Sequence, residues 1–163
     1  MSDEVLIEVE VEADLWLEAL PPAEALVRRA ALAALAGAEE TGEVTVLLTD
    51  DAEMRELNRQ YRKKDKATNV LSFPAPEFAR PHLGDVALGF ETCAREAEEQ
   101  GKSLADHLSH LVAHGALHLV GYDHEDEADA EAMEALERRV LAGIGVADPY
   151  ASEGNDAQLR RPE

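Results

Sequence analysis

Three histidines in the second half of the chain have a spacing that suits a metal ion. His114 and His118 are four residues apart, and His124 follows six residues later. Residues four apart on an α-helix lie on the same face, about 6 Å apart along the helix axis. The imidazoles of His114 and His118 can therefore share one ion, provided that this segment is helical.

The third ligand must come from beyond the helix. Gly121 suits this need, because glycine readily adopts the left-handed conformation that ends a helix and reverses the chain. The reversal returns His124 toward the preceding helical turn. Three protein ligands leave one position of a tetrahedral ion open, as in catalytic zinc sites, whereas structural zinc sites usually have four. The pattern favours a catalytic Zn²⁺, although imidazole ligands also suit nickel, copper and iron.

The other histidines are interpreted differently. His110 and His118 are eight residues apart, which corresponds to about 12 Å of helical rise and is too far for both rings to reach one ion. We therefore interpret His107 and His110 as capping, packing or supporting residues. His82 follows Pro81 in a predicted loop and is expected to be solvated.

The histidine spacing also equals that of the metzincin proteases, H-E-x-x-H-x-x-G-x-x-H. This sequence has Gly115 where those enzymes place the glutamate that acts as general base. The loss of a general base typically costs about 10²–10⁴ in rate. A metal-dependent peptidase or another small-molecule hydrolase is therefore the less favoured hypothesis.

The histidine segment must be positioned by a fold of mixed strands and helices. Alternation of apolar and acidic residues predicts a strand over Val5 to Val11. An Ala- and Leu-rich helix is expected between Pro21-Pro22 and Gly37, and a helix capped by Ser103 carries the histidines. The remaining patterns predict strands over 43–48, 69–73 and 84–90, a loop over 74–81, and helices that end near 61, 100 and 141.

Strands and helices do not alternate strictly, which predicts an α+β fold with a small mixed β-sheet packed with helices. The length of 163 residues suits a single domain. We expect this domain to span residues 1–147, with the metal site on a helix and the loop after it. Residues 148–163 are polar and contain Gly and Pro, so they are expected to form a frayed tail.

Composition limits the location and the partners of the chain. The single cysteine excludes an intramolecular disulfide, the N-terminus lacks the pattern of a secretory signal, and no apolar run approaches the ~20 residues of a membrane span. A cytoplasmic protein with no membrane partner is expected. The net charge of −20 repels nucleic acid, but it is reversed locally in a basic run within eight residues: Arg59, Arg62, Lys63, Lys64 and Lys66. The overall acidity suggests adaptation to high salt as a hypothesis.

Three separate blocks of the sequence resemble the YbeY family. They are HGALHLVGYDH over residues 114–124, LNRQYRKKDKATNVLSFP over 57–74 and LGDVALG over 83–89. The resemblance implies an α+β fold and a metal-dependent endoribonuclease that cleaves single-stranded RNA. It further implies a role in rRNA maturation and quality control of the small ribosomal subunit, without DNA specificity.

By position, the resemblance makes His114, His118 and His124 the zinc ligands and Arg62 the family's functional arginine. The planar guanidinium of an arginine can hold a phosphate through two parallel hydrogen bonds and stabilise charge that develops during cleavage. Ser72 and Asp85, inside the matched blocks, can line the cleft or serve only as hydrogen-bonding residues, and they stay outside the predicted site.

The sequence is compatible with two routes of RNA cleavage and with a non-enzymatic role. Water activated by the ion can attack the phosphorus, or the neighbouring ribose 2′-OH can do so while the ion polarises the phosphate. A further hypothesis is a non-enzymatic ribosome assembly factor, in which the metal only staples the helix to the following loop and the basic run binds rRNA.

Overall fold

Four strands form one mixed sheet in the computed structural model, which describes residues 4–63, 68–123 and 125–150. The order across the sheet is β1-β2-β4-β3. Strands β1 (Val5–Val11), β2 (Gly42–Thr49) and β4 (His82–Gly89) run parallel to one another, and the edge strand β3 (Val70–Pro74) pairs antiparallel with β4. Ser72 of β3 pairs with Val86 of β4.

Six α-helices surround this sheet in the described residues. They are α1 (Leu15–Ala19), α2 (Ala23–Gly37), α3 (Asp51–Arg62), α4 (Phe90–Gln100), α5 (Leu104–Leu119) and α6 (Glu127–Gly143). A short 3-10 turn, Glu77–Ala79, connects β3 to β4. Capping side chains begin three of the helices, because Asp50, Ser103 and Asp126 each accept a hydrogen bond from the backbone N–H three residues later.

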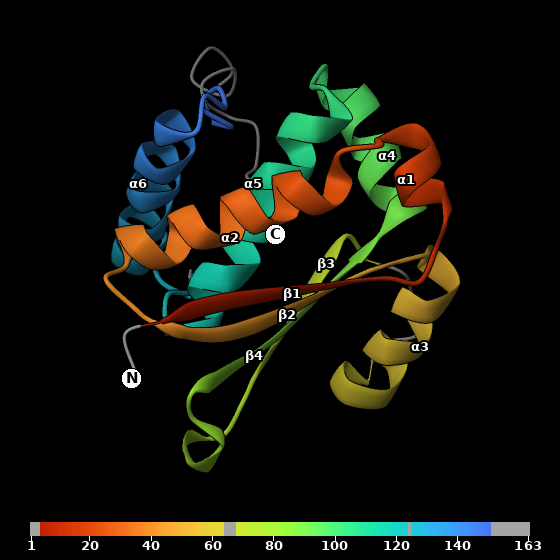
Figure 1. Ribbon diagram of the computed structural model, residues 1–163. Coiled ribbons are helices and arrows are strands. Elements are labelled where there is room, and N and C mark those ends of the chain that lie inside the picture. The colour runs from red at the N-terminus through yellow and green to blue at the C-terminus, as the bar shows by residue number, and fades with distance from the viewer. Residues whose placement is uncertain (1–3, 64–67, 124, 151–163) are drawn as a thin grey trace.

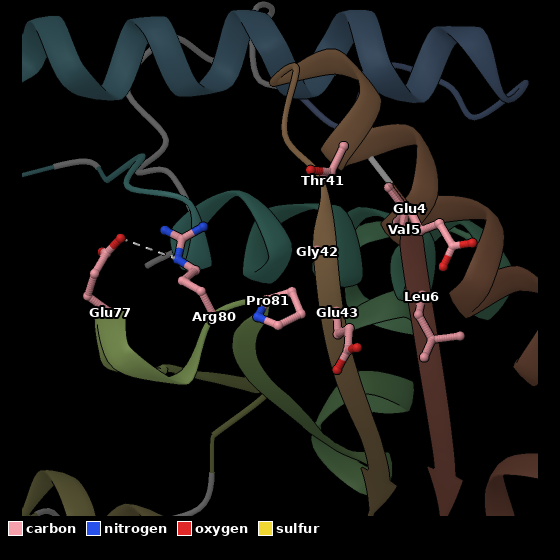
Figure 2. A pocket seen from close by; sticks show the side chains of 9 residues that line it. All are labelled: Glu4, Val5, Leu6, Thr41, Gly42, Glu43, Glu77, Arg80 and Pro81. Atoms are coloured by element: carbon pink, nitrogen blue, oxygen red, sulfur yellow. Dashed lines mark ion pairs between the residues drawn. The ribbon is translucent and has the colours of Figure 1, made fainter. Parts of the chain in front are cut away.

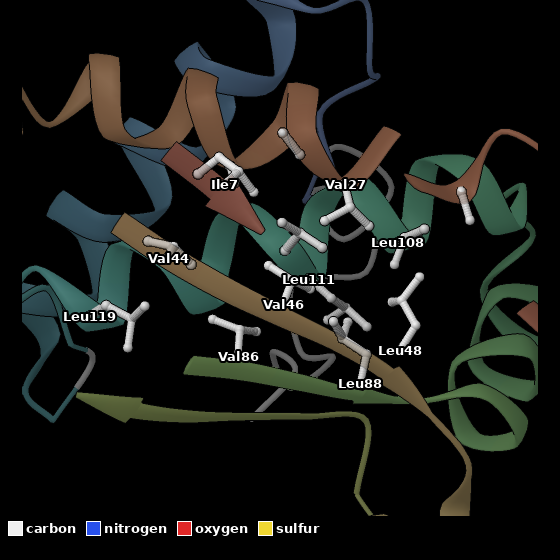
Figure 3. Packing of buried hydrophobic residues seen from close by; sticks show 14 of the residues in the cluster. Ile7, Val27, Val44, Val46, Leu48, Val86, Leu88, Leu108, Leu111 and Leu119 are labelled. Carbon is white, nitrogen blue, oxygen red and sulfur yellow. The ribbon is translucent and has the colours of Figure 1, made fainter. Parts of the chain in front are cut away.

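The helices divide between the two faces of the sheet. Helices α2 and α5 cover one face, with α6 packed outside them, and α3 lies on the other face (Figure 1). Alternation along β4 explains the division: Val86 and Leu88 belong to the large core under α5, whereas Ala87 packs with Met54 of α3. Figure 3 shows the aliphatic side chains that fill the large core between the sheet and the helices.

Helix α5 is the central helix of the fold. Of its 16 residues, 11 are buried, and it contacts α2, α4, α6, β3 and β4. A surface helix would present one apolar stripe, whereas a helix enclosed in this way is held on nearly all sides. The side chains that α5 carries therefore have positions that are fixed by packing.

The α+β prediction is confirmed, and each strand and long helix expected from the sequence is present with ends shifted by a few residues. Helix α1 was not predicted, and the predicted loop over 74–81 contains the short 3-10 turn. Tyr150, which falls in the predicted tail, is only 7% exposed, and residues 151–163 of that tail lie outside the described residues. In the part of the chain that is described, no helix has the length and apolar character needed to cross a membrane.

Candidate metal centre

The rings of His114 and His118 face one another on α5. Their Nε2 atoms are 3.1 Å apart, and both side chains are partly buried. The i,i+4 spacing places the two rings on one face of the helix, as the sequence predicted. Because α5 is packed on nearly all sides, the part of its backbone that carries both rings is held in place.

The backbone after α5 holds the ring of His118. Gly121 has a φ of +104°, and the chain reverses there, so that the backbone N–H of Tyr122 donates to the carbonyl of Leu117. The carbonyl oxygen of Tyr122 then lies 2.8 Å from Nδ1 of His118. A carbonyl can only accept, so this Nδ1 carries the proton. The reversal predicted at Gly121 is present, and His124, the predicted third ligand, lies outside the described residues.

A carboxylate from α6 holds the ring of His114. Nδ1 of His114 is 2.6 Å from Oε2 of Glu137, whose side chain is fully buried. Burial raises the pKa of the Glu137 carboxyl, but hydrogen bonds from His110 and His114 outweigh burial and leave this pKa well below its usual range. Glu137 is therefore ionised at neutral pH and accepts from Nδ1 of His114.

These two hydrogen bonds determine what the facing nitrogens can do. With Nδ1 protonated on both rings, each neutral imidazole has its lone pair on Nε2. Two lone pairs 3.1 Å apart repel one another unless a cation lies between them or one ring takes a second proton. Two nitrogens bound to one tetrahedral zinc ion at ~2.0–2.1 Å are about 3.3 Å apart. The donor types and their spacing thus fit a zinc-like ion.

A second group of side chains that are close enough to hold an ion includes Glu137. The ligand atoms of His110, His114 and Glu137 all lie within 4.8 Å of one another, so this cluster is also able to bind a metal. Nε2 of His110 is 3.3 Å from Oε1 of Glu137 and 3.3 Å from the hydroxyl of Tyr150. Burial lowers the pKa of His110, which favours its neutral form.

Sequence reasoning missed Glu137, although a signal was present. Glu137 lies four residues after Met133 and one after Leu136, within the apolar stripe of α6. An acidic residue on a buried stripe is rarely left without partners. His107 is also buried, and it pairs with Glu96 of α4 at 2.9 Å instead of joining the other histidines.

The glycine that follows His114 excludes the arrangement of a metzincin site. Gly115 faces the sheet, and a Cβ on it would lie 2.8 Å from Cγ1 of Val86 and 3.1 Å from Oγ of Ser72. A glutamate at this position has no space and would point into the core, away from the facing nitrogens. Ser72 donates its hydroxyl hydrogen to the carbonyl of Gly115 at 3.1 Å, so it supports the helix that carries the histidines.

Comparison with known proteins identifies the family of the chain. The sequence model of the family described as Endoribonuclease YbeY matches residues 20–145 of the chain. The chain belongs to the YbeY family. A protein of Rhodopseudomonas palustris (strain BisA53) named Endoribonuclease YbeY is 53% identical over 94% of each chain. A protein of the same name from Paramagnetospirillum magneticum is 48% identical over 94% of this chain and all of that protein.

A further YbeY relative, from Chelativorans sp. (strain BNC1), is 56% identical over 77% of this chain and 82% of its own. Among solved structures, the solution structure of a Thermotoga maritima protein has a TM-score of 0.50 to this chain. The two proteins are 26% identical, and the match covers 96% of this chain and 97% of that one. The resemblance to the YbeY family that the sequence blocks suggested is therefore confirmed.

Arg62, the arginine that the YbeY resemblance singled out, is exposed at the C-terminal end of α3. Helix α3 is on the face of the sheet opposite to α5. Its C-terminal end nevertheless contacts the edge strand β3, which α5 contacts as well. The ring centroids of Tyr61 and Phe73 are 5.4 Å apart. Ser72, the residue before Phe73, donates a hydrogen bond to the carbonyl of Gly115 on α5. The backbone of Arg62 thus lies on the α3 side of the sheet, near the part of β3 that contacts α5 on the other side.

The rest of the basic run is not uniform. Arg59 forms an ion pair with Glu56 on the same helix, whereas Lys63 is exposed and ends α3 in the left-handed conformation. Lys64 and Lys66 lie outside the described residues. Asp85 points to the face of the sheet away from α5 and lies 3.1 Å from His82, which is half-buried on β4 and not in a loop.

A hollow elsewhere on this YbeY family member does not suit an RNA backbone. It lies where β1 and β2 begin, beside the connection from β3 to β4 (Figure 2). Its charged side chains are three carboxylates and one guanidinium: Glu4, Glu43, Glu77 and Arg80. The guanidinium of Arg80 is 3.8 Å from the Glu77 carboxylate. An excess of carboxylates repels phosphates, which leaves the histidine pair on α5 as the centre of the candidate site.

Proposed function

We propose that this chain is a zinc-dependent endoribonuclease that cleaves single-stranded RNA, with His114, His118 and His124 as metal ligands and Arg62 as the catalytic arginine. The facing Nε2 atoms of His114 and His118, 3.1 Å apart with both Nδ1 atoms engaged, are the observation that supports it most strongly. The relatives named Endoribonuclease YbeY, about half identical over most of the chain, support the reaction class.

The roles of the residues follow from their surroundings. Glu137 and the carbonyl of Tyr122 hold the two rings through their Nδ1 atoms, so that both Nε2 atoms would be oriented toward a bound ion. A zinc ion held there would act as a Lewis acid toward a phosphodiester oxygen. Arg62 would bind the phosphate and stabilise charge on its oxygens as the bond breaks, since a guanidinium donates two parallel hydrogen bonds to a phosphate.

The cellular role proposed here is maturation of rRNA and quality control of the small ribosomal subunit, in the cytoplasm. It rests on membership of the YbeY family. A protein of net charge −20 must bind RNA through a region where the charge is locally positive. The exposed Arg62 and Lys63 supply a local positive charge at the edge strand. Single-stranded RNA is the expected substrate, with DNA of the same sequence left intact.

The test compares bound zinc with cleavage of a defined single-stranded oligoribonucleotide in wild-type protein and three variants. His118→Ala should lose both zinc and cleavage. Arg62→Ala should keep zinc and lose about 10²–10³-fold in cleavage, as when one group that stabilises charge in the transition state is removed. Arg59→Ala is the matched control, because Arg59 is paired with Glu56 on the same helix, and it should cleave RNA nearly as the wild type does.

The outcomes separate the hypotheses. A wild-type protein that binds zinc and leaves RNA intact would support the non-enzymatic assembly factor instead. Equal cleavage by wild type and Arg62→Ala would contradict the role of Arg62. The ends of the products identify the route, because attack by the 2′-OH leaves a cyclic phosphate or its hydrolysis product, whereas direct attack by water does not.

A further inference from the structure

Glu137 is a buried carboxylate with three hydrogen-bonding neighbours. Its Oε2 faces Nδ1 of His114, and its Oε1 faces Nε2 of His110 and the hydroxyl of Tyr150. An ionised carboxylate can only accept, so each of these neighbours must present a hydrogen to it. The protonation pattern of the whole cluster is thus fixed by one side chain.

The distances argue against Glu137 as a direct metal ligand. Oε2 of Glu137 and Nδ1 of His114 are 2.6 Å apart, the length of a strong hydrogen bond to a charged acceptor. Two ligand atoms on one tetrahedral ion at ~2.0–2.1 Å are separated by about 3.3 Å. The separation of the Nε2 atoms of His114 and His118, 3.1 Å, is closer to that value.

We propose that Glu137 is a positioning residue, which keeps the proton of His114 on Nδ1 and so reserves Nε2 for the metal, and that Tyr150 holds Glu137 in place. This inference rests on the proposed metal site. It places a residue from the segment after α6 in the support of that site. Hydrogen bonds to the far nitrogen of a metal-binding histidine fix its tautomer and orientation in this way in other metal sites.

The segment that carries Tyr150 is itself anchored. The ring of Tyr150 lies under the guanidinium of Arg138 at 5.3 Å, and its backbone N–H donates to Asp148, which pairs with Arg138. Nζ of Lys102 donates to the carbonyl of Pro149 at 3.2 Å. These contacts tie the segment to α6 and to the start of α5, so the hydroxyl of Tyr150 has a fixed position behind the histidines.

The variant Glu137→Gln gives a sharp prediction, because an amide has one oxygen and one NH₂ group. Two donors, from His110 and Tyr150, face one position of this group, and a single nitrogen of His114 faces the other. When the amide oxygen lies on the side of His110 and Tyr150, it accepts from both of these donors, so this orientation is favoured. The NH₂ group then faces His114. Nδ1 of His114 must then accept, and its proton moves to Nε2, the nitrogen that the ion needs.

The experiment measures the tautomers of zinc-free protein by ¹⁵N NMR and the affinity for Zn²⁺ by competition with a chelating dye. In the wild type, His114 and His118 should both be protonated on Nδ1. In Glu137→Gln, His114 should change to the Nε2-protonated form and the zinc affinity should fall about 10–100-fold. Tyr150→Phe should lower the affinity less than Glu137→Gln, and Glu131→Gln, an exposed change on the same helix, should not alter it.

His118 reports on folding within the same sample. Its Nδ1 donates to the Tyr122 carbonyl, which Glu137→Gln does not touch, so His118 must keep its tautomer in a folded variant. An unchanged His114 tautomer, or a change of tautomer with zinc affinity within twofold of wild type, would overturn the inference. Absence of zinc binding in the wild type would instead overturn the proposed function, while the tautomers of the zinc-free protein would still decide the role of Glu137.

Discussion

Gly115 and Val86 are in such close contact that a Cβ on the glycine would lie 2.8 Å from Cγ1 of the valine. The carbonyl of Gly115 also accepts a hydrogen bond from the hydroxyl of Ser72 on β3. The same residue therefore determines how closely α5 packs against the edge strand. The glycine is therefore a packing requirement of the helix that carries His114 and His118.

Gly115→Ala should destabilise the protein by about 1–3 kcal/mol, the usual cost of overpacking a core. Alanine gains about 1 kcal/mol of helix propensity over glycine, but Val86 is a β-branched residue on a central strand and cannot move aside at low cost. Urea unfolding followed by circular dichroism measures the difference. Gly143→Ala is the matched control, since that glycine is on α6 with nothing within 4 Å, and it should be neutral or stabilising.

The histidine pair was predictable because its geometry is local. A spacing of four on a helix, followed by a glycine that ends the helix, determines the arrangement of His114, His118 and Gly121 without knowledge of the rest of the fold. The φ of +104° at Gly121 and the Nε2 separation of 3.1 Å agree with it. The ligand roles of His114, His118 and His124 and the catalytic role of Arg62 stay predictions.

What the sequence did not reveal depends on contacts between distant elements. Glu137 is 23 residues from His114, and its place on the apolar stripe of α6 indicates burial but does not indicate which side chain it contacts. The strand order that places Ser72 under Gly115 is likewise not written in any local pattern. Helix α1 has only five residues, which is too short for a helical period to be recognised.

Zinc should stabilise the folded protein if it binds the proposed ligands. At 100 times the dissociation constant, a ligand of the native state adds about 2.7 kcal/mol, which for a chain of this size raises Tm by about 5–10 °C. Thermal unfolding with a chelator and with added Zn²⁺ measures the effect. His118→Ala should lose it. If the rise persists in His118→Ala and disappears in His110→Ala, the ion is held by His110, His114 and Glu137 instead.

Glu96 should make stability depend on pH in the acid range. Burial raises the pKa of its carboxyl, but hydrogen bonds from His107 and Asn69 outweigh burial, so this pKa is lowered in the folded state. A depressed pKa contributes stability that is fully present above the unfolded value, about 4.3, and is lost as the pH falls through the lower folded value.

The variant Glu96→Gln should therefore cost about 1 kcal/mol at pH 7, and the difference from wild type should shrink below pH 4 as the native carboxyl is protonated. Urea midpoints over a pH series measure it. Glu99→Gln, an exposed change on the same helix α4, provides the baseline. A difference between Glu96→Gln and wild type that stays constant from pH 7 to pH 3 would contradict this account.

Trp16 should account for most of the stability that helix α1 contributes. Its side chain is fully buried, its Nε1 donates to the carbonyl of Thr49 at 2.9 Å, and its ring meets Phe90 edge-on at 5.2 Å. Trp16→Ala removes this packing and leaves a buried carbonyl without its donor, which together should cost about 3–5 kcal/mol in the free energy of unfolding. Leu17→Ala is the control on the same helix, because Leu17 is 37% exposed and should lose far less. Similar losses for the two variants would show that α1 is held by its backbone contacts, and that Trp16 does not anchor it to the end of β2 and the start of α4.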